Sequence, residues 1–162
     1  MIIGCSSNDE VTKELINYYN NNWITVQKMK EEGIGKKRLE LLRTEEEGNE
    51  KAGDFVEEEI LPSMQEVLDY LHDVKLEHKE NQKLHQLQVE AEEFFYKSLQ
   101  DGAENYRGKV SDDEIYKNTD KLEEKYDAFL ERRDELMKKY NIEWDEDSSE
   151  NGYHKMKLGT EE

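Results

Sequence analysis

The sequence has few residues that break helices or link chain segments covalently. Its 162 residues include one proline, nine glycines and a single cysteine. One cysteine excludes a disulfide within the chain, and so few prolines and glycines leave room for long helices. Hydrophobic residues make up only 34% of the chain, below the roughly 45–50% of typical globular proteins. Because nine tyrosines, four phenylalanines and two tryptophans are present, we expect ordered helices that each bury one narrow stripe.

Basic surfaces and long apolar runs are absent as well. The formal net charge is −18, and the densest basic cluster is Lys36-Lys37-Arg38. Nucleic-acid backbones bind stripes of Lys and Arg, so we expect no nucleic acid among the partners. No apolar run in the sequence approaches the roughly 20 residues that span a bilayer. Such a charge suits either a solvated helical surface or a basic partner.

Motifs for catalysis or cofactor binding are also missing from the sequence. It contains no G-x-S-x-G turn, no glycine-rich phosphate loop and no calcium loop of EF-hand spacing. A di-iron bundle needs paired Glu-x-x-His elements, and only Asp69 and His72 come near that spacing. We therefore predict a protein that is not an enzyme and that holds no cofactor and no metal.

Helical spacing dominates the first third of the chain. Hydrophobic residues recur at steps of three, four and seven from Val11 to Met29, which predicts an amphipathic helix. Gly33 and Gly35 then interrupt the pattern, as a bend or as a true turn. Gly48-Asn49 is the stronger stop signal, because both residues tolerate the left-handed conformation that ends helices.

A second long helix is predicted to start near Asp54, which has the form of a capping box. A heptad of hydrophobic residues covers 60–74, and Pro62 predicts a kink or a fresh helix start within it. The hydrophobic face that returns at Leu84 is out of phase with this heptad. A stutter near residues 77–83 or a turn there would explain the shift. Since that segment lacks glycine and proline, we favour one helix.

The third predicted helix begins at a second capping box, Ser111 with Glu114. Hydrophobic residues then repeat every seven positions, at Ile115, Leu122, Phe129 and Leu136. Beyond this helix the composition turns acidic and polar, which is typical of a mobile tail.

Three long helices predict an all-α fold, an elongated antiparallel three-helix bundle with coiled-coil-like packing. The number rises to four helices if Gly33–Gly35 is a turn. We expect a leader or tether over 1–9, the bundle over 10–141 and an acidic mobile tail over 142–162. Long helices with heptads often dimerise, so a homodimer stays open.

Three polar residues fall on the predicted core heptad of the second helix. Carried forward from the hydrophobic positions, the heptad lands on His78, Asn81 and His85. Buried polar residues at core positions can set the register between helices. These residues therefore predict a polar core layer, unless the stutter turns them toward solvent.

The only cysteine lies next to the N-terminus, in the stretch Ile2-Ile3-Gly4-Cys5. This stretch resembles the end of a bacterial lipobox, and the polar residues that follow it resemble the tether common after the lipidated cysteine. The resemblance implies that Cys5 is the mature N-terminus and carries diacylglycerol on its sulfur. The basic and apolar parts of such a signal do not precede Ile2, so this interpretation requires a native start upstream of Met1.

The rest of the chain is loosely similar to small helical lipoproteins of Gram-positive envelopes, several of which are described as cell-wall-binding or of unknown function. The resemblance implies a lipid-anchored extracytoplasmic protein with a non-enzymatic binding or structural role at the cell envelope. Its partner would be a protein or the cell wall, and the lipid anchor its only membrane contact. The alternative is a cytoplasmic acidic coiled-coil adaptor, or an inhibitor of a basic protein.

Overall fold

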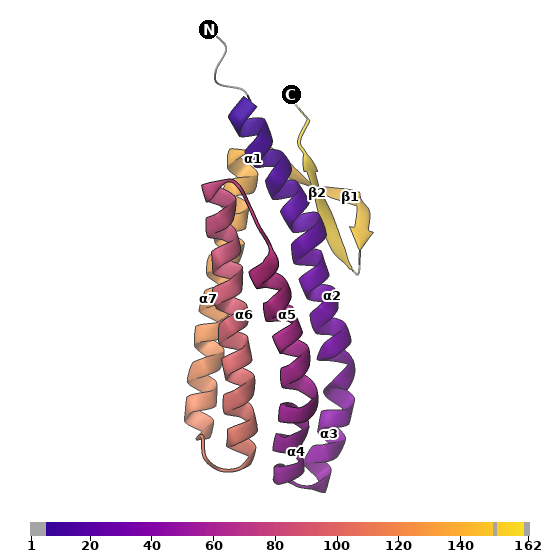
Figure 1. Ribbon diagram of the computed structural model, residues 1–162, viewed down its shortest axis with the longest axis vertical. Coiled ribbons are helices and arrows are strands. Elements are labelled where there is room, and N and C mark those ends of the chain that lie inside the picture. Colours follow the sequence, from indigo (N-terminus) through magenta and orange to yellow (C-terminus); the bar gives the residue numbers. More distant parts are fainter. Residues whose placement is uncertain (1–5, 151, 161–162) are drawn as a thin grey trace.

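The structure is a computed structural model that describes residues 6–150 and 152–160. These residues are mostly helical and form four helical rods and a small two-stranded antiparallel sheet (Figure 1). The rods run antiparallel along one long axis. The helical class and the elongated antiparallel arrangement predicted from the sequence are therefore correct, whereas the prediction of three helices and no sheet is wrong.

The first rod covers residues 6–47 and includes α1 (Ser6–Asn17), α2 (Ile24–Gly33) and α3 (Arg38–Glu47). A π-helical segment (Tyr18–Trp23) joins α1 to α2, and a 3₁₀ turn (Gly35–Lys37) joins α2 to α3. Because α1 begins at Ser6, residues 6–9 are the first turn of a helix and not part of a tether.

Gly33 and Gly35 do not reverse the chain. A Cβ atom on Gly33 would lie 2.7 Å from the Cβ of Ser63 on the second rod. Gly33 therefore permits a close approach of two rods, and the first rod continues past it. The reversal comes at Gly48, whose φ of 133° suits glycine, as its stop signal predicted.

The second rod covers residues 49–73, with α4 (Asn49–Phe55), a π-helical segment (Val56–Ile60) and α5 (Leu61–Asp73). It begins five residues before the predicted start at Asp54. Asp54 instead lies within the rod and accepts a hydrogen bond of 2.6 Å from Arg107. Pro62 stands in the first turn of α5, directly after the π-helical segment. The rod continues through this point in helical conformation, so the helix does not start afresh at Pro62.

The chain then leaves the helical conformation between Asp73 and Lys79, so the single helix predicted through this region is wrong. Val74 and His78 have extended backbones, with ψ near 128° and 129°. The next rod is α6 (Lys79–Tyr106). This turn supplies the fourth rod, and it forms without glycine or proline.

The fourth rod is α7 (Asp112–Lys139), which starts at the predicted capping box. The Ser111 side chain accepts a hydrogen bond from the backbone N–H of Glu114 at 3.3 Å. After the rod, Asn141 adopts a positive φ of 49° and the chain turns into two strands, β1 (Ile142–Glu150) and β2 (Tyr153–Leu158).

These strands replace the mobile tail predicted over 142–162. Ile142 pairs with Leu158 and Trp144 with Met156, and the register shifts between Asp145 and Ser149. The hairpin is fixed to the first rod by Asn20, whose side-chain amide bonds both backbone groups of Met156, at 2.7 and 2.8 Å. Burial of Met156 and Ile142 explains why this acidic segment is ordered.

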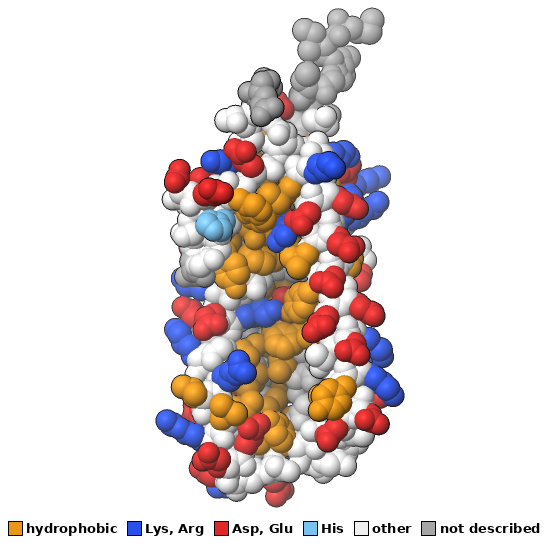
Figure 2. Space-filling view, turned by 180° about the vertical axis from the view of Figure 1, so that it is seen from behind, with side chains coloured by type: hydrophobic (Ala, Val, Ile, Leu, Met, Phe, Trp, Pro, Cys, Tyr) orange, Lys and Arg blue, Asp and Glu red, His pale blue; other side chains and the backbone are white. Residues whose placement is uncertain are grey.

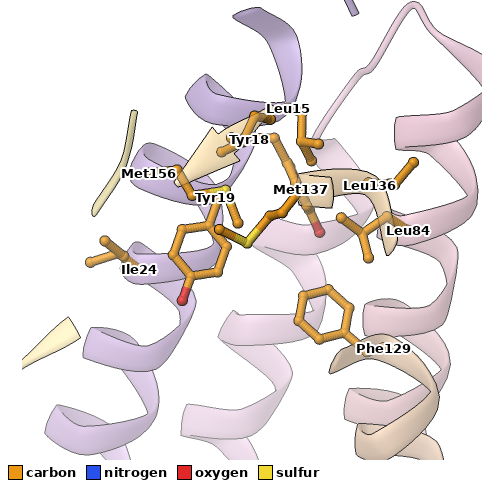
Figure 3. Close-up of a cluster of buried hydrophobic side chains, with 10 residues drawn as sticks. Leu15, Tyr18, Tyr19, Ile24, Leu84, Phe129, Leu136, Met137 and Met156 are labelled. Atoms are coloured by element: carbon orange, nitrogen blue, oxygen red, sulfur yellow. The ribbon is translucent and has the colours of Figure 1, made fainter. Parts of the chain in front are cut away.

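Buried side chains form three clusters along the bundle. In the first, residues from α1, the π-helical segment, α6, α7 and the hairpin converge (Figure 3). The middle cluster lies between α2 and α5, with Val26, Met64, Val67 and Leu71 fully buried. The third, around Val56 and Ile60, closes the other end.

The rods are not packed equally on all sides. α5 packs between α2 and α6, and α7 packs mainly along α6. Between α2 and α7 the hairpin covers one end, where β2 contacts the first rod and β1 contacts α7. The rest of this seam has no covering element among the described residues.

Candidate functional site

A stripe of polar side chains follows one face of α6 toward the first rod. Asn81, His85, Gln88 and Glu92 succeed one another at steps of four, three and four residues, which is one helical face. Asn81 and Glu92 are fully buried, Gln88 is 2% exposed and His85 is partly buried. Asn81 and His85, two residues of the predicted polar core layer, thus lie on the face of α6 toward the first rod, whereas His78 precedes α6 in an extended conformation.

At the start of the stripe, Glu14 of α1 caps α6. Its carboxylate accepts hydrogen bonds from the backbone N–H groups of Glu77 and His78, at 2.6 and 3.2 Å, and from the Asn81 amide at 2.7 Å. The His78 ring nitrogen Nδ1 lies 3.1 Å away. Burial alone would raise the pKa of Glu14, but these donors outweigh it and the pKa is lowered.

In the middle of the stripe, Tyr18 from the first rod meets two residues of α6. Its hydroxyl donates to Gln88 Oε1 and lies 3.2 Å from His85 Nδ1. Burial raises the pKa of Tyr18 far above its usual value and lowers the pKa of His85. At neutral pH this layer is therefore uncharged.

At the far end of the stripe, a buried carboxylate meets a lysine and a tyrosine. Lys30 Nζ lies 2.9 Å from both oxygens of Glu92 and 2.8 Å from the Tyr126 hydroxyl, which in turn donates to Glu92 at 3.0 Å. Lys30 also stands over the Phe95 ring, 4.9 Å from its centroid. Burial, then the nearby Glu92 charge, raises the pKa of Tyr126. This triad connects α2, α6 and α7.

Hollows open beside this triad on the uncovered seam. One, of about 190 Å³, lies between Trp23 of the first rod and Tyr126 and Leu130 of α7. A second, of about 250 Å³, lies beside Ile34, Phe95 and other residues next to Lys30. Gln27 lines both hollows. We call this continuous surface between α2 and α7 the groove.

Figure 2 shows the face that carries the groove: hydrophobic side chains run along the long axis, interrupted by basic groups, with acidic side chains along the α7 edge. Eight acidic residues of α7 are exposed and belong to none of the salt bridges among the described residues: Asp112, Asp113, Glu114, Asp120, Glu123, Glu124, Asp127 and Glu131. Glu123 and Asp127 precede Tyr126 and Leu130 by three residues, so each pair shares one helix surface. The groove thus has apolar stretches on both sides of the Lys30–Tyr126 contact and is acidic along one edge.

The part of the chain that the structure describes has neither a cluster of metal ligands nor a membrane-spanning helix. No group of three or more His, Cys, Asp or Glu side chains is placed there to hold a metal ion. None of the helices in these same residues combines the length and apolar character needed to cross a bilayer. Cys5, the predicted lipid-attachment residue, lies outside the described residues.

The sequence alone did not single out Lys30, Tyr126 or Glu14. Each looks like an ordinary polar residue of a helical stripe, and its partner lies between 62 and 96 residues away in the chain. Glu92 could have been found by continuing the polar spacing one step beyond Gln88. The chain matches no protein-family model, no curated protein and no solved structure.

Proposed function

We propose that this protein is a non-enzymatic binding module whose groove holds a basic amphipathic segment of a partner protein. The observation that supports the proposal is the combination of an apolar groove and an adjoining edge of unpaired carboxylates. An amphipathic helix laid into an apolar groove is a common mode of peptide recognition. The net charge of −18 favours a basic partner electrostatically.

Charge also explains how the partner would be oriented. The acidic edge belongs to α7, while the α2 side of the groove carries basic and acidic residues together, such as Lys30 and Glu31. A segment with its basic residues on one side would therefore lie with that side toward α7. Its apolar side would cover Leu130, which is 36% exposed.

We further propose that the module acts at the cell envelope, anchored outside the membrane by lipid on Cys5. This part rests on the lipobox-like stretch alone, and its test is independent of the groove. Expressed from its native gene, the protein should enter the membrane fraction, and a Cys5→Ala variant should not. An in-frame stop codon upstream of Met1 would contradict the anchor if the codons between it and Met1 encode no start and no apolar segment. The cytoplasmic acidic adaptor, which would use the same groove, would then remain.

The groove is tested with a labelled amphipathic peptide of Lys and Leu and a matched peptide of Glu and Leu. The Lys/Leu peptide should bind and the Glu/Leu peptide should not, and added salt should weaken binding. A Glu123→Lys, Asp127→Lys variant should lose about tenfold in affinity, because both substitutions oppose the peptide charge at the groove.

The matched control reverses two exposed carboxylates on the second rod, Glu58→Lys and Glu66→Lys. It changes the net charge equally but leaves the groove intact, so affinity should fall much less. Equal losses in the two variants would mean that the peptide follows overall charge and not the groove. A second copy of the chain is the competing occupant, and sedimentation of a dimer that the groove variant dissociates would assign the groove to it.

A further inference from the structure

The smaller hollow of the groove has the size of a single ring. Its volume is about 190 Å³, and a cavity of roughly 150 Å³ is known to accommodate benzene. Three aromatic rings, one leucine and three polar residues line it: Trp23, Tyr126, Phe129, Leu130, Gln27, Gln88 and Glu92. Such a lining, apolar with few polar groups, is typical of small-ligand sites.

Two of the aromatic rings that line this cavity are parallel to each other. The rings of Trp23 and Phe129 make an interplanar angle of 4°, with centroids 6.5 Å apart. Tyr19 stacks on Trp23 at 4.5 Å, and the edge of Tyr153 meets it at 5.0 Å, so the indole is held in place before any ligand arrives. Fixed flat walls favour a flat guest.

The cavity also borders a buried donor that lacks a partner. Gln88 uses Oε1 to accept the Tyr18 hydrogen bond, while its Nε2 has no hydrogen-bond partner among the described residues. Buried polar groups without partners are rare and call for an explanation. The Glu92 carboxylate is different, because Lys30 and Tyr126 already bind it. The group without a partner at this site is thus the Gln88 donor, which needs a hydrogen-bond acceptor, whereas the Glu92 carboxylate needs no further cation.

We infer that this cavity binds a flat aromatic ring that carries a hydrogen-bond acceptor, namely the phenol of a tyrosine in the docked segment. The inference rests on the proposed function. A phenol oxygen can accept from Gln88 Nε2, whereas a phenylalanine ring has no acceptor and an indole N–H only donates. The ring would lie against Trp23 and Phe129, and the rest of the segment would follow the groove.

The cavity itself is tested with p-cresol and toluene, the side-chain analogues of tyrosine and phenylalanine. Their dissociation constants are measured on the full chain by ligand-observed NMR. p-Cresol should bind about tenfold more tightly than toluene, because it alone satisfies the buried donor. Equal affinities for the two ligands, or no binding of either, would overturn the inference.

Two variants separate the roles of the donor and the cavity. Gln88→Met removes the donor at similar volume, so p-cresol affinity should fall to that of toluene, which should be unchanged. Leu130→Trp fills the mouth from a partly exposed position and should abolish binding of both. Circular dichroism and a thermal melt check that each variant folds. If Gln88→Met does not fold, Leu130→Trp and the wild-type selectivity still decide.

A peptide pair then identifies the source of the ring. Two Lys/Leu peptides are compared that differ only in carrying Tyr or Phe at one apolar position. The Tyr peptide should bind the wild-type protein more tightly than the Phe peptide does. In the Leu130→Trp variant this difference in affinity should disappear. Selective p-cresol binding without this gain would overturn the docked tyrosine and assign the cavity to a free phenolic ligand. Selective p-cresol binding with no peptide bound at all would refute the proposed function while leaving the cavity a phenol site.

Discussion

The seam between α5 and its neighbours and the seam between α2 and α7 belong to one bundle but are built differently. α5 buries Met64, Val67 and Leu71 completely, with no charged side chain among them. Across the other seam, α2 reaches α7 through Lys30 and Tyr126, and hollows open on both sides.

The two seams are expected to differ in how much they contribute to the stability of the fold and to the proposed recognition of a partner. An apolar seam gains free energy roughly in proportion to the area it removes from water. A buried ion pair gains little net free energy, because desolvation offsets most of the attraction. The α5 seams therefore hold the bundle together, while the α2–α7 seam keeps a fixed polar arrangement beside a surface that no described element covers.

The largest effect is expected when the ion pair is broken on one side. Lys30→Met should cost about 3–5 kcal/mol of unfolding free energy, because it leaves the fully buried Glu92 without its cation. Urea denaturation measures the cost. The double variant Lys30→Met, Glu92→Leu should recover most of it. If the double variant is as unstable as the single one, the triad stabilises the fold and the comparison of seams is wrong.

A substitution in the apolar seam should lower the unfolding free energy by a similar amount, and no second substitution is expected to restore it. Leu71→Ala should cost about 2–5 kcal/mol, since it opens a cavity in the middle cluster. Leu39→Ala, at a position that is 71% exposed, serves as the matched control and should change stability by less than about 0.5 kcal/mol. Chemical denaturation of both variants provides the measurement, and a cost below about 1 kcal/mol for Leu71→Ala would place the core elsewhere.

A smaller effect is expected at the cap of α6. Glu14→Gln should cost about 1–3 kcal/mol, because an amide replaces the carboxylate that binds two backbone N–H groups and Asn81. Glu10→Gln, an exposed neighbour on α1, should have no measurable effect. Thermal melts of the two variants at neutral pH compare them, and equal melting temperatures would show that Glu14 does not hold the turn.

The smallest effect concerns pH. The pKa of His85 is lowered in the folded chain, mainly by burial, from an ordinary value of 6.5. Below about pH 6.5 the His85 side chain binds a proton in the unfolded chain but not in the folded chain. The unfolding free energy should therefore fall as pH decreases. His85→Gln should flatten this dependence. Glu14, whose pKa is also lowered, adds a further loss only below about pH 4.5. An unchanged slope in His85→Gln between about pH 7.5 and 5 would contradict the assignment.

The sequence predicted those features of the fold that depend on local signals. The heptad of α7, its Ser111 cap and the stop at Gly48 all act within a few residues. The turn after Asp73 could not be predicted in this way. It contains no glycine or proline, and the carboxylate that caps the next helix lies 63 residues earlier, in Glu14.

The sequence contains a local signal for the hairpin, but the acidic composition of this segment favoured the prediction of a mobile tail. Ile142 and Trp144 alternate with polar residues, and the dipeptide Asn151-Gly152 is a strong hairpin signal. In the candidate site, the spacing of Asn81, His85 and Gln88 within α6 is a property of the sequence, although the heptad that drew attention to it was carried across a break in the helix. Lys30 and Tyr126 could not be predicted, since only packing brings three rods to Glu92.

The central claim, that the seam between α2 and α7 is a binding groove, is tested most directly by NMR mapping of the labelled chain with the Lys/Leu peptide. Shifts should concentrate at Trp23, Gln27, Tyr126 and Leu130, and should disappear in the Glu123→Lys, Asp127→Lys variant. Shifts spread over the outer face of α4 and α5, or shifts that this variant leaves unchanged, would contradict it.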